Sequence, residues 1–313
     1  MGIYKGLGFN HIRAMFYVAL QGAYQASFLP QIGNTFRSDQ PSEIYRFLGQ
    51  LPAMRRWIGQ RQIAQANPYQ LTIINDAWEG STGVAKQDLE RDKTGQVRAK
   101  ISQLAVRAVE LPEKLLTGIL TDNETAYDAT ALFADRSALS TGGARDNRLT
   151  DVTAAADARV VTSAEMAAAI LDGIANIIGA HDDQGEPLNG RAQQFAVMFP
   201  TAYIGPVTAA LADVFTSAGV SNTLRSTPFG VTPIHNARLA APTSSSGMIY
   251  VFRTDTPVRS VIWQEEKMPG FEALQEGSDH AFHTGEFLYG TDMRGNAAAG
   301  LPEMCARMEF KNA

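Results

Sequence analysis

The chain has 313 residues, of which 45% are hydrophobic and 19% are charged. This composition is typical of a globular protein with a sizeable core, and it excludes the disordered, collagen-like and disulfide-rich classes. No apolar run approaches the ~18 residues of a transmembrane helix, so we expect a soluble, unprocessed intracellular protein with no membrane partner. The single cysteine, Cys305, cannot form an internal disulfide. It lies in a predicted strand, on the face opposite the neighbouring Met and Phe, where we expect a partly covered thiol.

The charge is divided unevenly along the chain. Residues 1–75 contain seven basic and two acidic residues, whereas the remainder contains 20 basic and 30 acidic residues. A basic N-terminal quarter can bind nucleic acid, or it can dock on acidic surfaces of neighbouring copies. Because the whole chain has a net charge of −5, tight general binding of nucleic acid is disfavoured, and we favour docking.

The N-terminal quarter is predicted to contain a helix, an arm and strands. Apolar residues three and four positions apart predict an amphipathic helix over 11–28. Proline and glycine interrupt residues 29–41, which we expect to form an extended arm. A helical fragment or turn is expected over 43–49, and strands are expected over 61–85.

One of these strands carries two glycines. Trp78, Gly80, Thr82 and Val84 alternate along one of its faces. Glycine weakens a core strand, so we expect a hairpin that projects from the domain and pairs with something outside it. For Trp78, an interface position and burial in the chain's own core are equally good readings.

The longest predicted helix runs from about residue 94 to 120. Its apolar stripe consists of Val97, Ile101, Leu104, Ala108, Leu111, Leu115 and Ile119. Pro112 lies inside this pattern, where it removes a backbone hydrogen bond, so we expect a kink or the end of the helix's first half. A loop-rich region over 121–160 follows.

A different unit is predicted to begin at Thr162. Thr162 and Glu165 form a capping box at the start of a helix. We expect a buried strand over 195–199 and a second helix capped by Thr201. The rest is expected to be mostly strands, including 248–253, 259–264 and 282–289.

We find no pattern for a catalytic, cofactor-binding or metal site. Asp182, Asp183 and Glu186 lack the ligand spacing of a calcium loop and are expected in a solvated turn. His280 and His283 would point to opposite faces of the strand predicted there. The chain has no phosphate-binding loop, dinucleotide fingerprint or nucleophile elbow. We therefore predict a protein that is not an enzyme and binds no cofactor.

A motif between residues 45 and 63 carries a family resemblance. Its pattern is Leu-Gly-x-x-Pro-x-x-x-x-Trp-x-Gly-x-Arg, formed here by Leu48, Gly49, Pro52, Trp57, Gly59 and Arg61. This motif resembles the Mu-like major head subunit family of tailed bacteriophages. The resemblance continues at 79–80, 88–92, 111–116, 127–128 and 133–135, and beyond these it follows the order of elements more than the residues. The turn at Asn67-Pro68 departs from it, since relatives often have a longer polar turn.

The resemblance implies an α+β protein with the Hong Kong 97-type capsid fold. It implies an N-terminal arm over 1–54, an extension loop over 55–90 and an axial-domain core over 162–225. Residues 91–161 and 226–313 would form the peripheral domain, with the spine helix at about 94–120 and strands shared with the axial domain.

The implied function is that of a major capsid protein, which assembles into the hexamers and pentamers of an icosahedral head. Its partners would be its own copies, a separate scaffold protein and a portal, with a cement protein left open. Packaged double-stranded DNA would be contacted without sequence readout. The protein would be located in the virion after assembly in the host cytoplasm.

The resemblance and the charge pattern place the subunit interfaces on the arm and the loop. The residues expected there are Arg37, Arg46, Arg55, Arg56, Trp57, Arg61, Tyr69, Trp78 and Glu79. Two other functions stay open. The shell of a cellular encapsulin-type compartment would enclose cargo without DNA, and a two-domain α/β enzyme with a dispersed active site would be a compact monomer or dimer.

Overall fold

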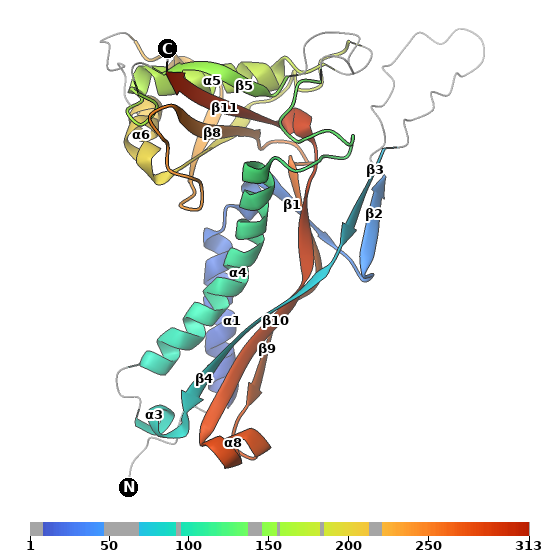
Figure 1. The fold of residues 1–313 in the computed structure, drawn as a ribbon, viewed down its shortest axis with the longest axis vertical. Helices are drawn as coiled ribbons and strands as arrows, with labels where there is room; N and C mark the ends of the chain where they lie inside the picture. The colour runs from blue at the N-terminus through green and yellow to red at the C-terminus, as the bar shows by residue number, and fades with distance from the viewer. Residues whose placement is uncertain are drawn as a thin grey trace, which may run out of the picture.

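The computed structural model describes residues 9–46, 69–91, 95–136, 146–154, 157–181, 185–212 and 221–312. The molecule is elongated: a long body of helices and strands carries a second unit at one end (Figure 1). Each unit has its own sheet, so the α+β class is confirmed.

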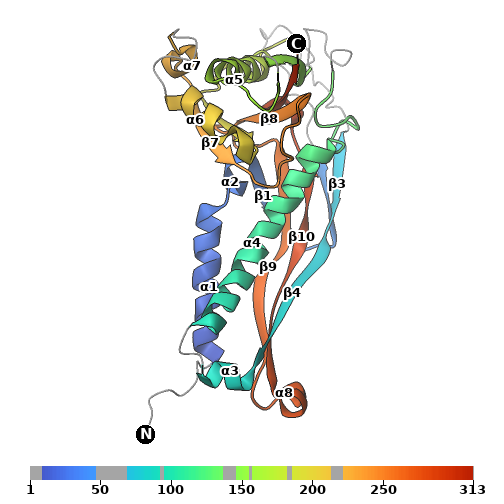
Figure 2. The same cartoon turned by 60° about the vertical axis from the view of Figure 1, so that its left-hand side comes forward.

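The long body is a layer of two helices on a four-stranded sheet. The helices α1 (Phe9–Ala26) and α4 (Gln96–Asp122) run side by side along one face of the sheet (Figure 2). The strand order is β1-β9-β10-β4, in which only β1 runs parallel to its neighbour. The bounds are β1 (Gly33–Arg37), β4 (Asp76–Ala85), β9 (Val261–Leu274) and β10 (Glu286–Ala299). The amphipathic helix and the long helix are thus confirmed.

The second unit is built on a five-stranded sheet with the order β5-β11-β8-β6-β7. The bounds are β5 (Arg148–Ala154), β6 (Gln194–Phe199), β7 (Gly230–His235), β8 (Ser246–Arg253) and β11 (Cys305–Asn312). The helices α5 (Ser163–Ile178) and α6 (Ile204–Ala212) pack on one face of this sheet, and the short α7 (Thr223–Ser226) follows them. The predicted capping box is present: the Thr162 hydroxyl accepts the Glu165 N–H at 3.2 Å, and the Glu165 carboxylate accepts the Thr162 N–H at 2.8 Å.

Both faces of the five-stranded sheet are buried. Phe195, Val197 and Phe199 of β6 face α5 and α6. Met198 of β6 and Phe252 of β8 face the other way, against the C-terminal end of α4. Strands buried on both faces have nearly continuous apolar sequences, which explains the run over 195–199.

Helix α4 belongs to both units. Its first half packs on the four-stranded sheet through Val97 and Ile101, and its last turns bury Leu116 and Leu120 beneath the five-stranded sheet. Pro112 is buried inside one continuous helix, so the helix does not end there, and the alternative expectation of a kink stays a prediction. Burial on both sides of the proline offsets the single hydrogen bond that it removes.

Much of the arm predicted over 29–41 and of the helix or turn predicted over 43–49 forms strands. Residues 29–32 form the short helix α2 (Leu29–Ile32), and the next five residues form β1, which pairs in parallel with β9. The expected helix or turn over 43–49 is wrong for its described part, because β2 (Ser42–Arg46) pairs with β3 (Gln70–Ile74) in a separate two-stranded ribbon. Residues 47–49 lie outside the described residues. The pairing with β3, which is distant in sequence, decides the conformation of β2.

The segment around the two histidines is a helix and not a strand. The helix α8 (Asp279–Thr284) joins β9 to β10, begins at a Ser278 cap and ends at Gly285, whose φ is 68°. His280 and His283 therefore lie one helical turn apart. The prediction that they point to opposite faces of a strand is wrong. Across the part of the chain that the structure describes, no three His, Cys, Asp or Glu side chains gather to hold a metal ion.

Three further details complete the fold. Thr201 does not cap α6: it begins the single turn η2 (Thr201–Tyr203), and its hydroxyl lies 2.9 Å from His235 Nε2. Cys305 is 1% exposed, more buried than expected, and burial raises the pKa of its thiol. The remaining short elements are α3 (Lys86–Arg91) and η3 (Pro302–Met304).

Candidate subunit interface

Strand β4 carries two of the predicted interface residues, Trp78 and Glu79. It is an edge strand, and all ten of its residues pair with β10, from Asp76 opposite Gly295 to Ala85 opposite Glu286. The prediction of a projecting hairpin is therefore wrong for these residues. The long register with β10 supplies enough pairing to hold a strand that contains two glycines.

Trp78 is half-buried and packs against the core where the two units meet. Its indole N–H donates a hydrogen bond to the Gly295 carbonyl oxygen at 2.9 Å. The burial reading of Trp78 is confirmed in part, and its interface role stays a prediction. Glu79 is exposed, and its carboxylate accepts a hydrogen bond from the Ser81 hydroxyl at 3.4 Å.

Two more of the predicted residues belong to the β2–β3 ribbon. Arg46 is the last residue of β2, and Tyr69 lies immediately before β3. Arg46 is exposed at the end of β2, and the Tyr69 ring lies edge-on to Tyr127 with 5.6 Å between ring centroids. The outer face of the ribbon exposes Ile44 to 55% and Ile74 to 63%. A two-stranded ribbon alone is marginally stable in water, so this apolar face favours a partner.

Arg37 lies at the end of β1, opposite Glu265 of β9. The Glu265 side chain is buried, and burial raises the pKa of its carboxyl, opposed by the charge of Arg37 and by a hydrogen bond from Trp263. Burial and then the Glu265 charge raise the pKa of Tyr24 to about 12. A carboxyl with a perturbed pKa therefore lies where α1, β1 and β9 meet.

The structure spreads the predicted interface residues that it describes over several elements. Arg37 and Arg46 are exposed on β1 and β2, and the rings that precede them, Phe36 and Tyr45, have centroids 5.3 Å apart. Trp78 and Glu79 lie apart from these on β4. Four residues, Arg55, Arg56, Trp57 and Arg61, lie outside the described residues.

A buried polar cluster joins the two units, and sequence reasoning missed it. Arg136 and Asp128 form an ion pair at 2.6 Å with side chains only 2% and 5% exposed. The guanidinium also donates to the carbonyl oxygens of Ala131 and Leu132, at 2.7 and 3.1 Å. The ion pair closes the loop that follows α4. The only signal was the family resemblance at residues 127–128, which include Asp128, and at residues 133–135, which precede Arg136.

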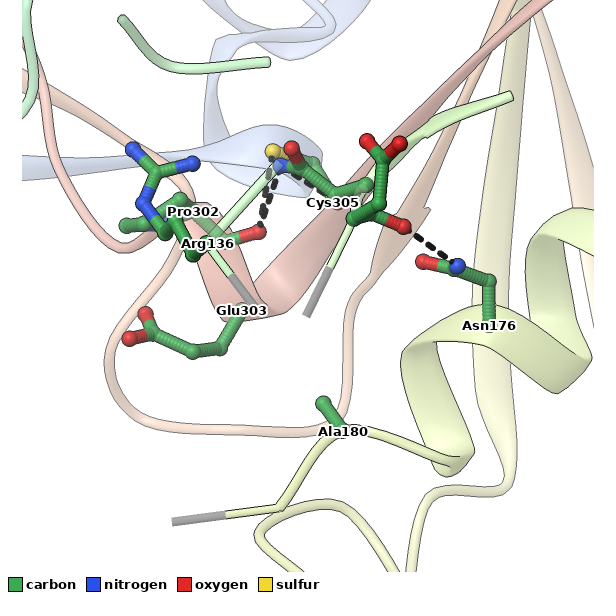
Figure 3. A pocket seen from close by; sticks show the side chains of 8 residues that line it. Arg136, Asn176, Ala180, Pro302, Glu303 and Cys305 are labelled. Carbon is green, nitrogen blue, oxygen red and sulfur yellow. Dashed lines mark hydrogen bonds between the residues drawn. The ribbon is translucent and has the colours of Figure 1, made fainter. Parts of the chain in front are cut away.

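Asn147 extends this cluster to the C-terminal strand. Its amide donates to the carbonyl oxygens of Leu132, Pro302 and Cys305 at 2.9–3.2 Å. Figure 3 shows the small cavity beside it, with Arg136 and Glu303 on one side and Asn176 on the other. The cavity volume is about 20 Å³, which is room for one water molecule. The cluster therefore has a structural role, and the cavity beside it is too small for an organic ligand.

The sequence matches the family model described as Mu-like prophage major head subunit gpT, over residues 8–158 and 234–311. The chain belongs to this family. The stretch without a match, 159–233, contains α5, α6 and β6. It lies in the second half of the chain, where the sequence resemblance follows the order of elements more than the residues.

A named relative agrees with the family assignment. The major capsid protein of Escherichia phage Mu is 29% identical over 105 residues, which are 33% of this chain and 34% of that protein. The match therefore spans about a third of the length of that relative.

Solved structures share the fold. The mature capsid of bacteriophage PhiM1 superposes with a TM-score of 0.56 at 13% identity, over 92% of this chain and 87% of that one. A virus-like particle from Pyrococcus furiosus has a TM-score of 0.53 at 10% identity, over 96% of this chain and 98% of that one. The Hong Kong 97-type fold predicted for the family is confirmed.

Proposed function

We propose that this chain is a major capsid protein, a structural protein and not an enzyme, that assembles through its own copies into the icosahedral head of a tailed phage. The observation that carries the proposal is the family match, which spans α1, the ribbon, α4 and the C-terminal strands. The elongated shape and the exposed apolar ribbon support it, since both suit a subunit that is completed by its neighbours.

The domains of the proposed subunit follow the two sheets. The peripheral domain consists of α4 with the four-stranded sheet, and the axial domain consists of α5, α6 and the five-stranded sheet. The extension loop is the β2–β3 ribbon with the intervening residues 47–68, and it ends before β4. This division moves the loop from the expected 55–90 to 42–74.

The proposed partners are hexamer and pentamer neighbours, a separate scaffold protein, a portal and packaged DNA. Exposed basic residues on α4, Arg98, Lys100 and Lys114, suit contacts with phosphates that do not read sequence. The proposed location is the virion, after assembly in the host cytoplasm.

The test is assembly. We expect the full chain, expressed together with the scaffold protein of its phage, to form rings or closed icosahedral shells in negative-stain electron microscopy. Shells that enclose protein cargo and never DNA would support the compartment alternative instead. A chain that stays monomeric with scaffold present would contradict both the capsid and the compartment functions. The two-domain enzyme would then be the hypothesis to test.

A further inference from the structure

Two arginines lie side by side on the five-stranded sheet. Arg148 of β5 is in register with Arg307 of β11, and the two strands run parallel. Residues in register on neighbouring strands point to the same face, about 5 Å apart. The next residues, Leu149 and Met308, pack in the core of α5 and α6, so both arginines lie on the opposite face. Like charges directly opposite each other destabilise a sheet, so this pair calls for a compensating group.

Neither arginine forms an ion pair within the part of the chain that the structure describes, although acidic side chains lie close in sequence. Glu309, two residues along the same face of β11, accepts a hydrogen bond from the Ser246 hydroxyl at 3.0 Å and pairs with Lys311 at 3.9 Å. Asp146 accepts a hydrogen bond from the backbone N–H of Arg148 at 2.8 Å and none from its guanidinium. The two positive charges are therefore left without a carboxylate partner in the described subunit.

Arg307 is held in place and keeps an unused donor. Its guanidinium lies over the Phe133 ring, 5.5 Å from the ring centroid, which is a cation–π contact. The side chain is half-buried, and its Nε–H is buried without a hydrogen-bond partner. A buried donor on a charged group is costly when it has no partner, so an acceptor at this position would be stabilising.

Tyr250 of β8 continues the row on the other side of Arg307. Burial raises the pKa of its hydroxyl to about 12, and the charge of Arg307 opposes this rise. The hydroxyl donates only a long bond, 3.8 Å, to Met248 Sδ. The row across β5, β11 and β8 therefore presents hydrogen-bond donors and two positive charges.

The arrangement of the two guanidiniums favours a phosphate over a carboxylate. The two oxygens of one carboxylate match the fork of a single guanidinium. Two guanidiniums on neighbouring strands instead approach a ligand from two directions, which suits a tetrahedral oxyanion with several acceptor oxygens. Arg148 is exposed, so a ligand can reach the pair from solution.

We propose that Arg148 and Arg307 form a binding site for a phosphate group. The source of the group is free phosphate or the phosphodiester backbone of nucleic acid, which present the same oxygens. The proposal goes beyond the proposed function and does not depend on it, because both arginines belong to one subunit and the test needs no assembly.

Phosphate binding to the free subunit tests the site. Inorganic phosphate is titrated against chloride at constant ionic strength, and binding is followed by calorimetry and by the melting temperature. We expect phosphate to raise the melting temperature of the wild type, and Arg148→Gln and Arg307→Gln each to weaken phosphate binding by about tenfold or more. Because Arg148 is exposed, Arg148→Gln keeps the test valid even if Arg307→Gln does not fold. An unchanged affinity in Arg148→Gln, or no phosphate-specific response of the wild type, would overturn the proposal.

The matched control is Arg191→Gln, which removes an exposed arginine of the second unit that lies outside the row. It is expected to bind phosphate as the wild type does. In chloride alone, Arg148→Gln is expected to melt at a higher temperature than the wild type, because it removes the repulsion between like charges. A lower melting temperature would show that Arg148 is already compensated within the subunit, and it would contradict the proposal.

Two further ligands identify the source of the phosphate. A short double-stranded DNA that competes with phosphate in the wild type, and loses affinity in Arg148→Gln, assigns the site to the nucleic-acid backbone. Binding of inorganic phosphate without competition from DNA assigns it to free phosphate. Acetate that binds as tightly as phosphate at the same ionic strength would show a carboxylate site and overturn the phosphate assignment.

Discussion

At the scale of single residues, the most consequential feature is the buried Arg136–Asp128 ion pair. Removing one partner of a buried ion pair is costly, because the charge that remains has lost its hydration and has no compensating partner. Here the pair also holds the loop that connects α4 to the second unit.

We predict that Arg136→Ala lowers the free energy of unfolding of the free subunit by about 3–5 kcal/mol, because Asp128 would be left buried and unpaired. Urea denaturation measures this change. The control is Lys86→Ala, which removes the exposed Lys86–Glu276 pair and is expected to cost at most about 1 kcal/mol. Equal effects of the two variants would contradict the argument.

Glu265 gives the subunit a predictable pH dependence. Its pKa is raised in the folded state, so the folded chain binds this proton more tightly than the unfolded chain does. Its stabilising contribution is therefore fully present below the ordinary glutamate pKa of 4.5 and is lost as the pH rises through the raised value. The groups that face it are Tyr24, Arg37 and Trp263.

We expect Glu265→Gln to be more stable than the wild type at neutral pH, with a difference that shrinks towards pH 4. Unfolding free energies of the free subunit, measured at several pH values across this range, provide the test. A difference that stays constant with pH would show that the carboxyl does not titrate in this window.

At the scale of elements, the two threonines predicted to be helix caps differ in outcome. Thr162 forms the capping box of α5, whereas the Thr201 hydroxyl contacts His235. We predict that Thr162→Ala destabilises the subunit by about 1 kcal/mol and that Thr201→Ala has a smaller effect. Thermal unfolding of both variants checks this order, and a larger loss for Thr201→Ala would reverse it.

The residues between the two strands of the ribbon can be deleted while both strands are kept. Because Arg46 and Gln70 are paired, residues 47–69 can be replaced by a two-residue Asn-Gly turn without breaking the β2–β3 register. A deletion over 62–84 would instead remove β3 and most of β4, and with them an edge of the four-stranded sheet.

We predict that the short-turn variant is a soluble, folded subunit that does not form closed shells. Sizing chromatography and circular dichroism establish the fold, and electron microscopy with scaffold present measures assembly. Normal shells from this variant would show that residues 47–69 are dispensable for assembly.

At the scale of the whole molecule, α4 couples the two units. The neighbours Leu115 and Leu116 differ: Leu116 is fully buried at the junction, and Leu115 is half-buried. We predict that Leu116→Ala costs about 2–5 kcal/mol and lowers hydrogen-exchange protection in both sheets, and that Leu115→Ala costs less. Lost protection in one sheet only would indicate that the units unfold independently.

The amino-acid sequence by itself determined the features that depend on local periodicity and local hydrogen bonds. The stripes of α1 and α4, the capping box of α5 and the apolar run of β6 depend on residues within a few positions of one another. The motif around Trp57 was enough to predict the family and, through it, the fold.

Only the tertiary structure decided which strands pair and which polar groups meet. β2 forms because β3 lies beside it, β4 is held in a sheet by β10, and Arg136 finds Asp128 inside a loop. Local propensity cannot reveal such contacts, because their free energy comes from partners that are brought together only when the chain folds.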